Sequence, residues 1–522
     1  MEESTATTSK KAAKKAEAKR AAELAAATAN VTLQDDAAAE SYGARPAVFS
    51  HGAEEVDICS LNESHVDKTV IVRAWLQNSR VQSAKMGFLE LRKGANWSIQ
   101  GIVMASEEEP VVSRPMVKWV MGINPESFVA VEAKCYLVAS APSMLGMTLA
   151  VANKPIVNFS DDVPPAGNVV EAEKSTIPAA SMLTHLDNIA MHKRSPVQQA
   201  IADIRIEVKK PFRSYLEERG FKEFEPPCLI GAASEGGGNV FRLPYFGEEA
   251  FLAQSPQFYK QFEIAGGRER VFSIGPVFRA EISNTARHMT EFTGLDLEME
   301  VRESYTEVRD VLEGVLLHIF RGIQERCANE VATVRAVYPS EPFLLPEPGK
   351  EVRLTFAEAQ KLLREEGPAE FANVRDDEDM STPQEKALGE VVRSKYNTDF
   401  FVVDKFPETA RPFYAKIDET AAPIGDGVSV TNAFDFFARN QEILSGGQRI
   451  NDAVELEARI RAKGVDPESA GIKEYLAVFR SVGVPPHGGG GIGLDRVVAW
   501  YLGLPSVHLA AYYPRTPKRL SP

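Results

Sequence analysis

The chain has 522 residues, more than one hydrophobic core usually holds, so we expect about two to four domains of roughly 150 residues each. Its composition, 44% hydrophobic and 25% charged, is that of a globular protein and excludes a wholly disordered or fibrous chain. The four cysteines form no CxxC pair, and no apolar run reaches the roughly 18–20 residues of a membrane span. We therefore expect a soluble, cytoplasmic protein with no membrane partner. A net charge of −14 argues against wholesale coating of a nucleic acid but leaves room for a local basic patch.

The first segment, residues 1–50, is rich in alanine and carries its basic side chains close together. Lys11, Lys15 and Lys19 are four residues apart and would share one stripe of a helix. Such a helix has almost no large apolar residue to bury, so we expect a flexible basic extension. Stacked lysines suit phosphate contacts, which favours a nucleic-acid-binding arm over a solubilising tail, and the acidic residues among them disfavour a mitochondrial transit peptide.

Residues 55–160 alternate between polar and apolar side chains in the manner of β-strands. Five short β-rich segments with turn residues between them fit a small barrel of the OB type, and a generic β-sandwich is the alternative. The segments are 70–76, 88–92, 98–103, 129–138 and 148–151. Residues 161–196, rich in proline and small polar residues, predict a hinge between domains.

Residues 197–522 predict an α+β domain. Residues 197–219 have apolar side chains at helical spacing, with Ser195 and Pro196 as a start signal and Pro211 as an expected kink. A second helix is predicted over 305–327. We expect an insertion around 326–410, of which the polar stretch 366–390 should be exposed.

The segment HGGGGIG, residues 487–493, matches the dinucleotide-binding pattern G-x-G-x-x-G. That pattern requires a strand before it and a ribose-binding acid about twenty residues later. Here Pro485 and Pro486 precede the glycines, and Tyr513-Pro514-Arg515 stands where the acid should be. The dinucleotide-binding interpretation therefore fails. What remains is a glycine-rich segment that permits close backbone approach, followed by an apolar helix with Arg496 in its first turn, which suits an anionic ligand.

Charged residues crowd into the segment 278–300, FRAEISNTARHMTEFTGLDLEME. Both flanks alternate polar and apolar residues, which predicts two strands joined by a loop into an antiparallel hairpin with charges on one face. A solvated sheet face with cross-strand ion pairs is one interpretation. A cradle for a purine triphosphate is favoured, because phenylalanine, histidine and two arginines are mixed with the acids.

Three segments, in order along the chain, resemble the signature motifs of class II aminoacyl-tRNA synthetases, and within that class the aspartyl enzymes of eukaryotic and archaeal type. The first is the long helix followed by FKEFEPP at 221–227, the second is FRAE…RHMTEF at 278–292, and the third is GIGLDR at 491–496. The resemblance covers nearly all of the chain from about residue 55. It implies an N-terminal OB-fold barrel that binds the anticodon, then a catalytic domain with an antiparallel sheet flanked by helices. It also implies a homodimer with the first motif at its interface.

The resemblance implies that ATP binds to the second and third motifs with Mg²⁺. Arg279 would hold the α-phosphate and the attacking carboxylate, Arg496 the far end of the triphosphate, and Phe292 would stack on adenine. Arg279, Arg496 and Glu442 are the expected catalytic residues, and Glu442 with Ser445, assisted by Asp435, would hold the metal. The full ATP-binding set is Arg279, Ala280, Glu281, Arg287, His288, Met289, Phe292, Glu442, Gly493, Leu494, Asp495 and Arg496.

The resemblance also implies which residues select the amino acid. Lys260 and Arg449 would present two cations to a side-chain carboxylate, and the arginine can grip it bidentately. Glu235 and Asp296 are acids suited to the substrate ammonium group. The expected aspartate-binding set is Ser234, Glu235, Gln257, Lys260, Arg279, Asp296, Ser445 and Arg449.

For tRNA, the resemblance implies that Phe88 and Gln100 read the anticodon with Arg80 nearby, by stacking a splayed base on the aromatic ring. A core phenylalanine is the alternative for Phe88. The lysine-rich stretch resembles the tRNA-binding helix of these enzymes, which adds Lys10, Lys11, Lys14 and Lys15 to the expected tRNA-binding residues.

The expected function is ligation of L-aspartate to tRNA(Asp) at the expense of ATP. The alternatives are an asparaginyl or non-discriminating ligase, and a tRNA-binding paralogue with an altered acceptor. Some positions depart from the family pattern without touching the residues assigned to ATP or aspartate. They are Ile189, His192, Ile282, Ala286, Asn451 and Thr516.

Overall fold

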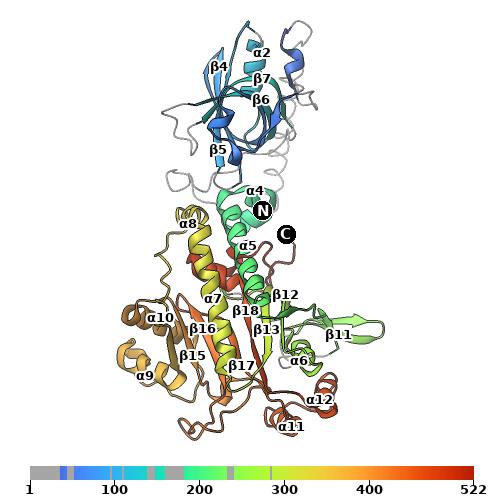
Figure 1. Cartoon of the computed structure of the whole chain (residues 1–522), viewed down its shortest axis with the longest axis vertical. Coiled ribbons are helices and arrows are strands. Elements are labelled where there is room, and N and C mark those ends of the chain that lie inside the picture. Colours follow the sequence, from blue (N-terminus) through green and yellow to red (C-terminus); the bar gives the residue numbers. More distant parts are fainter. Residues whose placement is uncertain are drawn as a thin grey trace, which may run out of the picture. The chain divides into compact units, whose positions relative to one another are not determined.

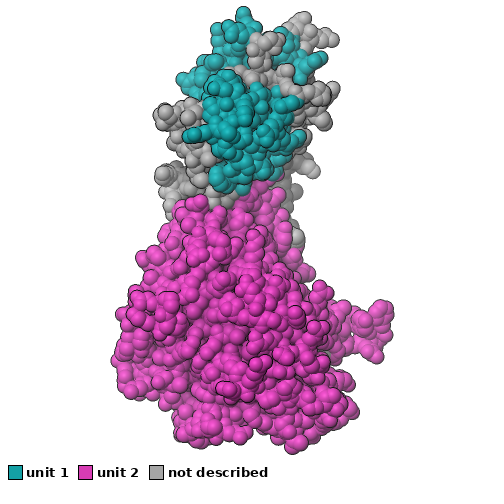
Figure 2. All heavy atoms as spheres, in the orientation of Figure 1, with its two compact units in different colours: residues 1–171 teal, residues 172–522 magenta. Residues whose placement is uncertain are grey.

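The computed structural model describes residues 36–43, 52–94, 97–108, 111–137, 147–158, 181–231, 240–282 and 285–521. The chain divides into two compact units, Met1–Glu171 and Ala172–Pro522, which are coloured separately in Figure 2. No helix in the described ranges is long and apolar enough to cross a membrane.

The first unit is a β domain whose strand pairing closes on itself. Strand β3 pairs with β4, β4 with β5, β5 with β7, β7 with β6, and β6 returns to β3. Only the β5–β7 pair of this ring is parallel. The bounds are β3 (Thr69–Ser83), β4 (Met86–Lys93), β5 (Trp97–Met104), β6 (Phe128–Leu137) and β7 (Met147–Asn158), with short strands β1 (Tyr42–Gly43) and β2 (Glu54–Glu55) alongside β7 and β3. This arrangement is consistent with the predicted OB-type domain.

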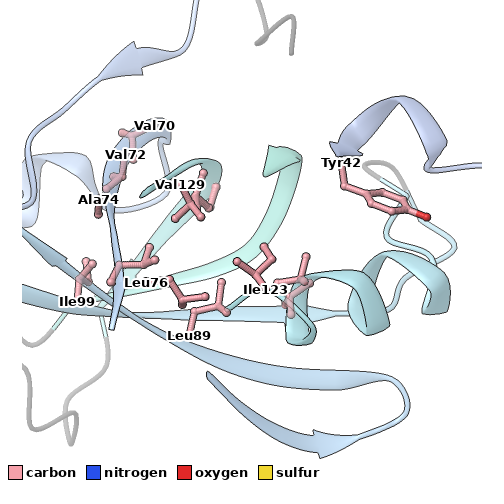
Figure 3. Close-up of a cluster of buried hydrophobic side chains, with 14 of the residues drawn as sticks. Tyr42, Val70, Val72, Ala74, Leu76, Leu89, Ile99, Ile123 and Val129 are labelled. Carbon is pink, nitrogen blue, oxygen red and sulfur yellow. The ribbon is translucent and has the colours of Figure 1, made fainter. Parts of the chain in front are cut away.

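Alternation along the strands builds the core of this unit. Leu89 and Leu91 of β4 are buried, whereas Phe88 and Glu90, which alternate with them, stay half-exposed on the other face. Helix α2 (Arg114–Met121) covers the barrel between β5 and β6, and the Ser113 side chain caps it by accepting a hydrogen bond from the Met116 backbone N–H at 3.0 Å. Figure 3 shows how the apolar side chains of several strands converge.

Residues just before the barrel also belong to its core. Ala38 is 1% exposed and Tyr42 is 7% exposed, and both join the cluster of buried side chains drawn in part in Figure 3. The Tyr42 hydroxyl donates to Asp36 at 2.7 Å, and Ser113 donates to the same carboxylate at 2.9 Å. Residues 36–43, inside the predicted extension 1–50, are therefore held by the barrel, and Lys10, Lys11, Lys14 and Lys15 lie outside the described residues.

The second unit is built on an eight-stranded sheet, in the order β14-β15-β16-β17-β18-β13-β12-β8. Its neighbours are antiparallel except for the parallel edge pairs β14–β15 and β12–β8. The bounds are β8 (Lys222–Glu223), β12 (Arg270–Phe278), β13 (Glu291–Glu300), β14 (Val352–Thr355), β15 (Phe400–Asp404), β16 (Ala433–Ala438), β17 (Gln441–Gln448) and β18 (His487–Gly493); a separate small sheet contains β9 (Leu229–Ile230), β10 (Arg242–Tyr245) and β11 (Glu248–Leu252). The predicted catalytic fold, an antiparallel sheet flanked by helices, is confirmed.

The long helices of this unit form where helical spacing predicted them. Helix α5 (Pro196–Glu217) starts with Pro196 in its first turn and contains Pro211; helix α7 (Thr306–Arg326) packs beside it, as Figure 1 shows. Arg205 lies on the buried face of α5 and pairs with Asp495 of helix α13 (Leu494–Leu502), which joins the first and third motifs. The other helices are α3 (Met182–Asp187), α4 (Ile189–Arg194), α6 (Gln257–Ala265), α8 (Ala328–Arg335), α9 (Phe356–Glu366), α10 (Thr382–Tyr396), α11 (Ala453–Ala462), α12 (Ile472–Ser481) and α14 (Val507–Ala510).

The glycine run forms the central strand β18 between β17 and β13. A Cβ at Gly489 would overlap the Glu298 carboxylate and the Leu297 carbonyl oxygen of the neighbouring strand. Glycine is therefore required there to leave room for buried acidic side chains on the sheet, in line with the close backbone approach that the sequence predicted.

Candidate active site

A cavity of about 250 Å³ lies on the antiparallel sheet of the second unit. It is lined by α6, the β12–β13 hairpin, β17, β18 and the segment around Arg411. The predicted site residues that line it are Gln257, Lys260, Arg279, Glu281, Arg287, His288, Met289, Phe292, Asp296, Glu442, Ser445, Arg449, Gly493, Asp495 and Arg496. Ser234 and Glu235 lie outside the described residues. Leu494 is fully buried, so its contribution to the site is to hold α13 in place.

The sheet register explains why residues distant in sequence meet here. Asp435 of β16 is the partner of Ser445 in β17, Ser445 is the partner of Gly491 in β18, and Gly491 is the partner of Asp296 in β13. Residues that are register partners share one face of a sheet. One row across four strands therefore places two acids, a hydroxyl and a glycine on the same face of the sheet, and Ser445, Gly491 and Asp296 of this row line the cavity whereas Asp435 does not.

Lys260, Arg449 and Glu298 form a buried ionic cluster at one end of the cavity. The Lys260 Nζ lies 3.1 Å from Asp296 Oδ1 and 3.3 Å from Glu298 Oε2, and the Arg449 Nε donates to Glu298 Oε1 at 2.9 Å. Lys260 is 1% exposed and Glu298 is 0% exposed. Burial raises the pKa of Glu298, but Arg449 and Lys260 outweigh it and hold that pKa below its ordinary value, so the carboxylate stays charged.

The two predicted specificity cations are thus brought together, and the sequence did not show that Glu298 joins them. Its only sequence signal was its place in the alternating strand, two residues after Asp296 and therefore on the same face. The cluster Lys260, Arg449 and Glu298 carries a net single positive charge, and Asp296 beside it carries a negative one.

A neutral hydrogen-bonded layer supports α6 behind this cluster. The His487 Nδ1 lies 2.8 Å from the Pro485 carbonyl oxygen, which requires the hydrogen on Nδ1, so Nε2 accepts from the Gln261 amide at 2.8 Å. Gln261 in turn accepts from the Tyr475 hydroxyl at 3.0 Å and from the predicted site residue Gln257 at 2.9 Å. Burial lowers the pKa of His487, which keeps this ring neutral. Gln261 therefore ties α6 to β18 and α12, and Gln257 extends this network to the cavity wall.

The β12–β13 hairpin carries the second motif. Phe278 pairs with Glu291 at the loop end of the hairpin, and the Arg279 backbone N–H donates to the Thr290 carbonyl at 3.0 Å, which anchors the start of the loop. The Arg279 guanidinium lies 5.5 Å from the centre of the Phe292 ring. A planar base can stack on the same ring while the arginine meets its phosphate. Ala280 precedes Glu281, whose carboxylate lies 4.0 Å from Arg279.

Arginines and acids alternate at the opposite end of the cavity. Arg496 Nη1 lies 3.2 Å from Glu442 Oε1, and Arg287 Nη1 lies 2.9 Å from Glu385 Oε2 of α10. Burial and the nearby Arg496 lower the pKa of His288, so this side chain offers a hydrogen bond rather than a charge near neutral pH. A polyanion such as a triphosphate fits between these arginines.

The expected Mg²⁺ ligands supply only oxygen, as that ion prefers. Arg411 donates to Ser445 Oγ at 2.8 Å and to Asp435 Oδ2 at 2.6 Å, while Asp435 Oδ1 is buried and has no hydrogen-bond partner among the residues that the structure describes. Burial raises the pKa of Asp435 to about 6 despite Arg411, whereas for Glu442 the effect of burial is outweighed by Arg496 and Arg411, which lower its pKa. Within the described part of the chain, no group of three or more His, Cys, Asp or Glu side chains could hold a metal by itself. These residues fit a cation that takes its remaining ligands from phosphate oxygens.

The predicted anticodon residues lie together on the first unit. Arg80 and Phe88 are register partners on β3 and β4, with the guanidinium 5.1 Å from the ring centre, and Gln100 of β5 is the partner of Glu90. Phe88 is half-buried and lies outside the core cluster, so its ring face can meet a base.

An antiparallel sheet whose cavity is lined by the second and third motifs, with helix α5 of the first motif held to α13 by Arg205 and Asp495, is the arrangement of a class II tRNA synthetase. The family model "tRNA synthetases class II (D, K and N)" matches residues 181–517, and the chain belongs to this family. Curated relatives include aspartate–tRNA ligases named as cytoplasmic from Bos taurus, 39% identical over 94% of this chain and 96% of the relative, and from Homo sapiens, with the same three values.

Solved structures show the same fold. The aspartyl-tRNA synthetase of Entamoeba histolytica is 34% identical with a TM-score of 0.79, covering 92% of this chain and 96% of that one. The asparaginyl-tRNA synthetase of Pyrococcus horikoshii, complexed with asparaginyl-adenylate, is 29% identical with a TM-score of 0.76, covering 90% of this chain and 100% of that one.

Proposed function

We propose that the chain is an aspartate–tRNA ligase, which activates L-aspartate with ATP and transfers the aspartyl group to the 3′ end of tRNA(Asp). The observation that carries this proposal is the buried Lys260–Glu298–Arg449 cluster, whose two cations line the same cavity as Arg279 of the second motif. The curated relatives named above support aspartate over asparagine. Their names also support work in the cytoplasm.

In the first reaction, an α-carboxylate oxygen of aspartate attacks the α-phosphorus of ATP, and pyrophosphate leaves on the opposite side. Arg279 neutralises charge that develops on the α-phosphate and aligns the attacking carboxylate. Arg496, Arg287 and His288 hold the pyrophosphate end, and Phe292 stacks on adenine. Mg²⁺ bound by Glu442 and Ser445, with Asp435, would neutralise further phosphate charge. Positioning and charge neutralisation suffice, so no protein nucleophile is required.

Selection of aspartate follows from the charges around the cluster. Lys260 and Arg449 bring two positive charges and Glu298 removes one, which leaves one charge for the side-chain carboxylate of the substrate. Asp296, which accepts from Lys260 at 3.1 Å, also supplies a negative charge beside the substrate ammonium group. Asparagine would leave the remaining positive charge without a partner and place its amide N–H₂ against cations. One unpaired buried charge costs a few kcal/mol, so discrimination on the order of 10²–10³ is available from this pocket.

The intact arginines oppose the main alternative from another class, a tRNA-binding scaffold without activity, because Arg279 and Arg496 both line the cavity with Glu442. An asparaginyl or non-discriminating ligase is the alternative within the same fold.

We further propose that the chain forms a homodimer through α5 and the segment FKEFEPP. We also propose that it binds tRNA through the basic extension and the face of the first unit that carries Phe88. Sedimentation of the full chain, with a dimer expected and a monomer contradicting it, tests the assembly.

The whole reaction is tested by charging tRNA(Asp) transcripts with labelled aspartate in the presence of ATP and Mg²⁺. We expect acid-stable label on tRNA(Asp) with aspartate and little with asparagine. Label on tRNA(Asn) as well would favour the non-discriminating alternative. No charging of either tRNA would favour the scaffold.

A further inference from the structure

The insertion contributes a helix to the phosphate end of the cavity, a role that the motifs alone do not assign. Arg287 belongs to the second-motif loop, and its Nη1 donates to Thr382 Oγ1 at 2.6 Å and lies 2.9 Å from Glu385 Oε2. Thr382, the acceptor, and Glu385, the ion-pair partner, both come from the first turns of α10 (Thr382–Tyr396). The loop and the helix are about a hundred residues apart in sequence, so the contact is tertiary.

This contact is largely closed to solvent. The Arg287 side chain is 11% exposed and the Glu385 side chain is 12% exposed. Burial raises the pKa of Glu385 to about 7, although Arg287 opposes the rise, so the protein retains a carboxylate where its environment disfavours the charge. An ion pair at such a site contributes little to net stability, so its presence is better explained by the placement of its arginine.

Arg287 keeps donors for a ligand while it is held in this way. Only Nη1 is engaged by α10, and Nε is buried without a hydrogen-bond partner among the described residues. A guanidinium has five N–H groups, so the remaining edge can serve a phosphate. Arg287 lines the cavity together with Arg496 and His288.

We propose that Glu385, assisted by Thr382, is a positioning residue for ATP: it fixes the Arg287 guanidinium from behind, so that its other edge meets the pyrophosphate end of the nucleotide. This inference rests on the proposed function in that the site binds ATP. An arginine side chain has many rotamers, and ATP would have to immobilise it alone if α10 did not. The acid therefore assists an anionic ligand, although its own charge repels one.

The two effects of Glu385 predict opposite results, which makes the proposal testable. Simple repulsion predicts that removing the acid tightens ATP binding. Positioning predicts that Glu385→Ala weakens it, and that Glu385→Gln, which keeps an acceptor oxygen at the same reach, recovers most of the loss. Glu390 is an exposed acid on the same helix, so Glu390→Ala is the matched control.

The experiment measures the Kd of the full chain for ATP with Mg²⁺ by calorimetry, without amino acid, and then the KM values for ATP and aspartate in pyrophosphate exchange. We expect Glu385→Ala to raise the Kd and the KM for ATP at least fivefold, within the range typical of contacting pairs, and to change the KM for aspartate less than twofold. In the Arg287→Ala background, Glu385→Ala should raise neither the Kd nor the KM for ATP any further. Thr382→Val should act in the same direction, by about two- to fourfold, and serves if Glu385→Ala melts early.

An unchanged or lower Kd for ATP in Glu385→Ala would overturn the proposal. So would equal losses for ATP and aspartate, or a Glu385→Ala effect that persists in the Arg287→Ala background, because both indicate a general structural role. A wild-type chain that binds ATP but shows no aspartate-dependent exchange would instead contradict the proposed function, since the calorimetric comparison needs no amino acid.

Discussion

At the scale of single residues, the site depends on how buried charges are shared. Glu298 accepts from Arg449 and lies within 3.3 Å of Lys260, so one carboxylate holds both cations in place before any substrate arrives. From the sequence, Lys260 and Arg449 were expected to face the substrate as two free charges. Because Glu298 cancels one of them, the specificity of this cluster rests on a single net positive charge.

Arg279 is the residue on which the chemical step should depend most. Its replacement by alanine removes the positive charge next to the reacting phosphate, a loss of about 3–4 kcal/mol of transition-state stabilisation and a rate loss of at least roughly 10²–10³. The half-exposed Arg279 side chain carries no core packing, so folding should be unaffected. Pyrophosphate exchange and thermal unfolding of the variant measure both quantities. Exchange within tenfold of wild type would show that the hairpin has been misassigned.

The residue types of the site could be predicted from the sequence, but some of their partners could not. Arg279, Phe292 and Arg496 lie in contiguous motifs, so their spacing was informative. Arg411 meets Asp435 and Ser445 only through tertiary packing, and the same holds for the meeting of Arg287 with Glu385. A single sequence contains no signal for such long-range pairs.

At the scale of elements, strand β18 shows how a sheet accommodates acids in its centre. Glycine is a poor strand former, so the run at 487–493 gave no strand signal, and only its neighbours explain it. Gly489 is the register partner of Glu298, and Gly491 is the partner of Asp296. The missing side chains provide the space that these two carboxylates occupy. By contrast, α5 and α7 could be predicted within a few residues, because apolar positions at helical spacing mark their buried faces.

Replacing Gly489 by alanine should therefore damage both stability and activity. The added Cβ would overlap the Glu298 carboxylate and a backbone oxygen that cannot move without shifting β13. Overpacking of this kind typically costs about 1–3 kcal/mol, and displacement of Glu298 would disturb Lys260 and Arg449 as well. We expect a lower melting temperature together with a higher KM for aspartate. Gly483→Ala, where an added Cβ meets open space, is the matched control, and equal behaviour of the two variants would contradict this account.

Helix α10 predicts a pH dependence of stability. The pKa of Glu385 is raised by burial from 4.5 to about 7, so the folded chain binds its proton more tightly than the unfolded chain does. The contribution of Glu385 to the unfolding free energy is therefore lost as the pH rises from about 4.5 to about 7, and it does not change further above pH 7. Glu385→Gln removes the titration. The difference in unfolding free energy between variant and wild type should shift in favour of the variant across that window, as measured by denaturant unfolding at several pH values. If the unfolding free energies of wild type and Glu385→Gln differ by the same amount at every pH from 4.5 to 7, this titration is excluded.

At the scale of the whole molecule, the two units divide the work: the barrel carries a candidate anticodon face and the sheet unit carries the chemistry. The division could be predicted from the change in pattern between residues 55–160 and 197–522. The residue at which the barrel domain begins could not be predicted, because Ala38 and Tyr42 lie in an alanine-rich stretch and yet are buried in the barrel core. The assignment of 1–50 as an extension and 161–196 as a hinge stays a prediction.

Removal of residues 1–35 tests the basic arm while sparing those buried residues. We expect weaker tRNA binding and unchanged amino-acid activation, because the clustered lysines would contact only phosphates. Loss of about five such contacts should reduce the slope of log K against log salt by roughly four to five, at ~0.9 per contact. Filter binding of tRNA(Asp) over a salt series measures the slope. A slope that does not change would reduce the arm to a solubilising tail.

The measurement that tests the central claim most directly is ATP–pyrophosphate exchange with aspartate and with asparagine, for wild type, Arg449→Ala and Lys260→Met. The account predicts that wild type prefers aspartate by on the order of 10²–10³ in kcat/KM. The preference should shrink most in Arg449→Ala, because arginine alone can grip a carboxylate bidentately, and less in Lys260→Met. Wild-type exchange that is as fast with asparagine as with aspartate, or variants that keep the wild-type ratio, would contradict the assignment of this chain as an aspartate–tRNA ligase.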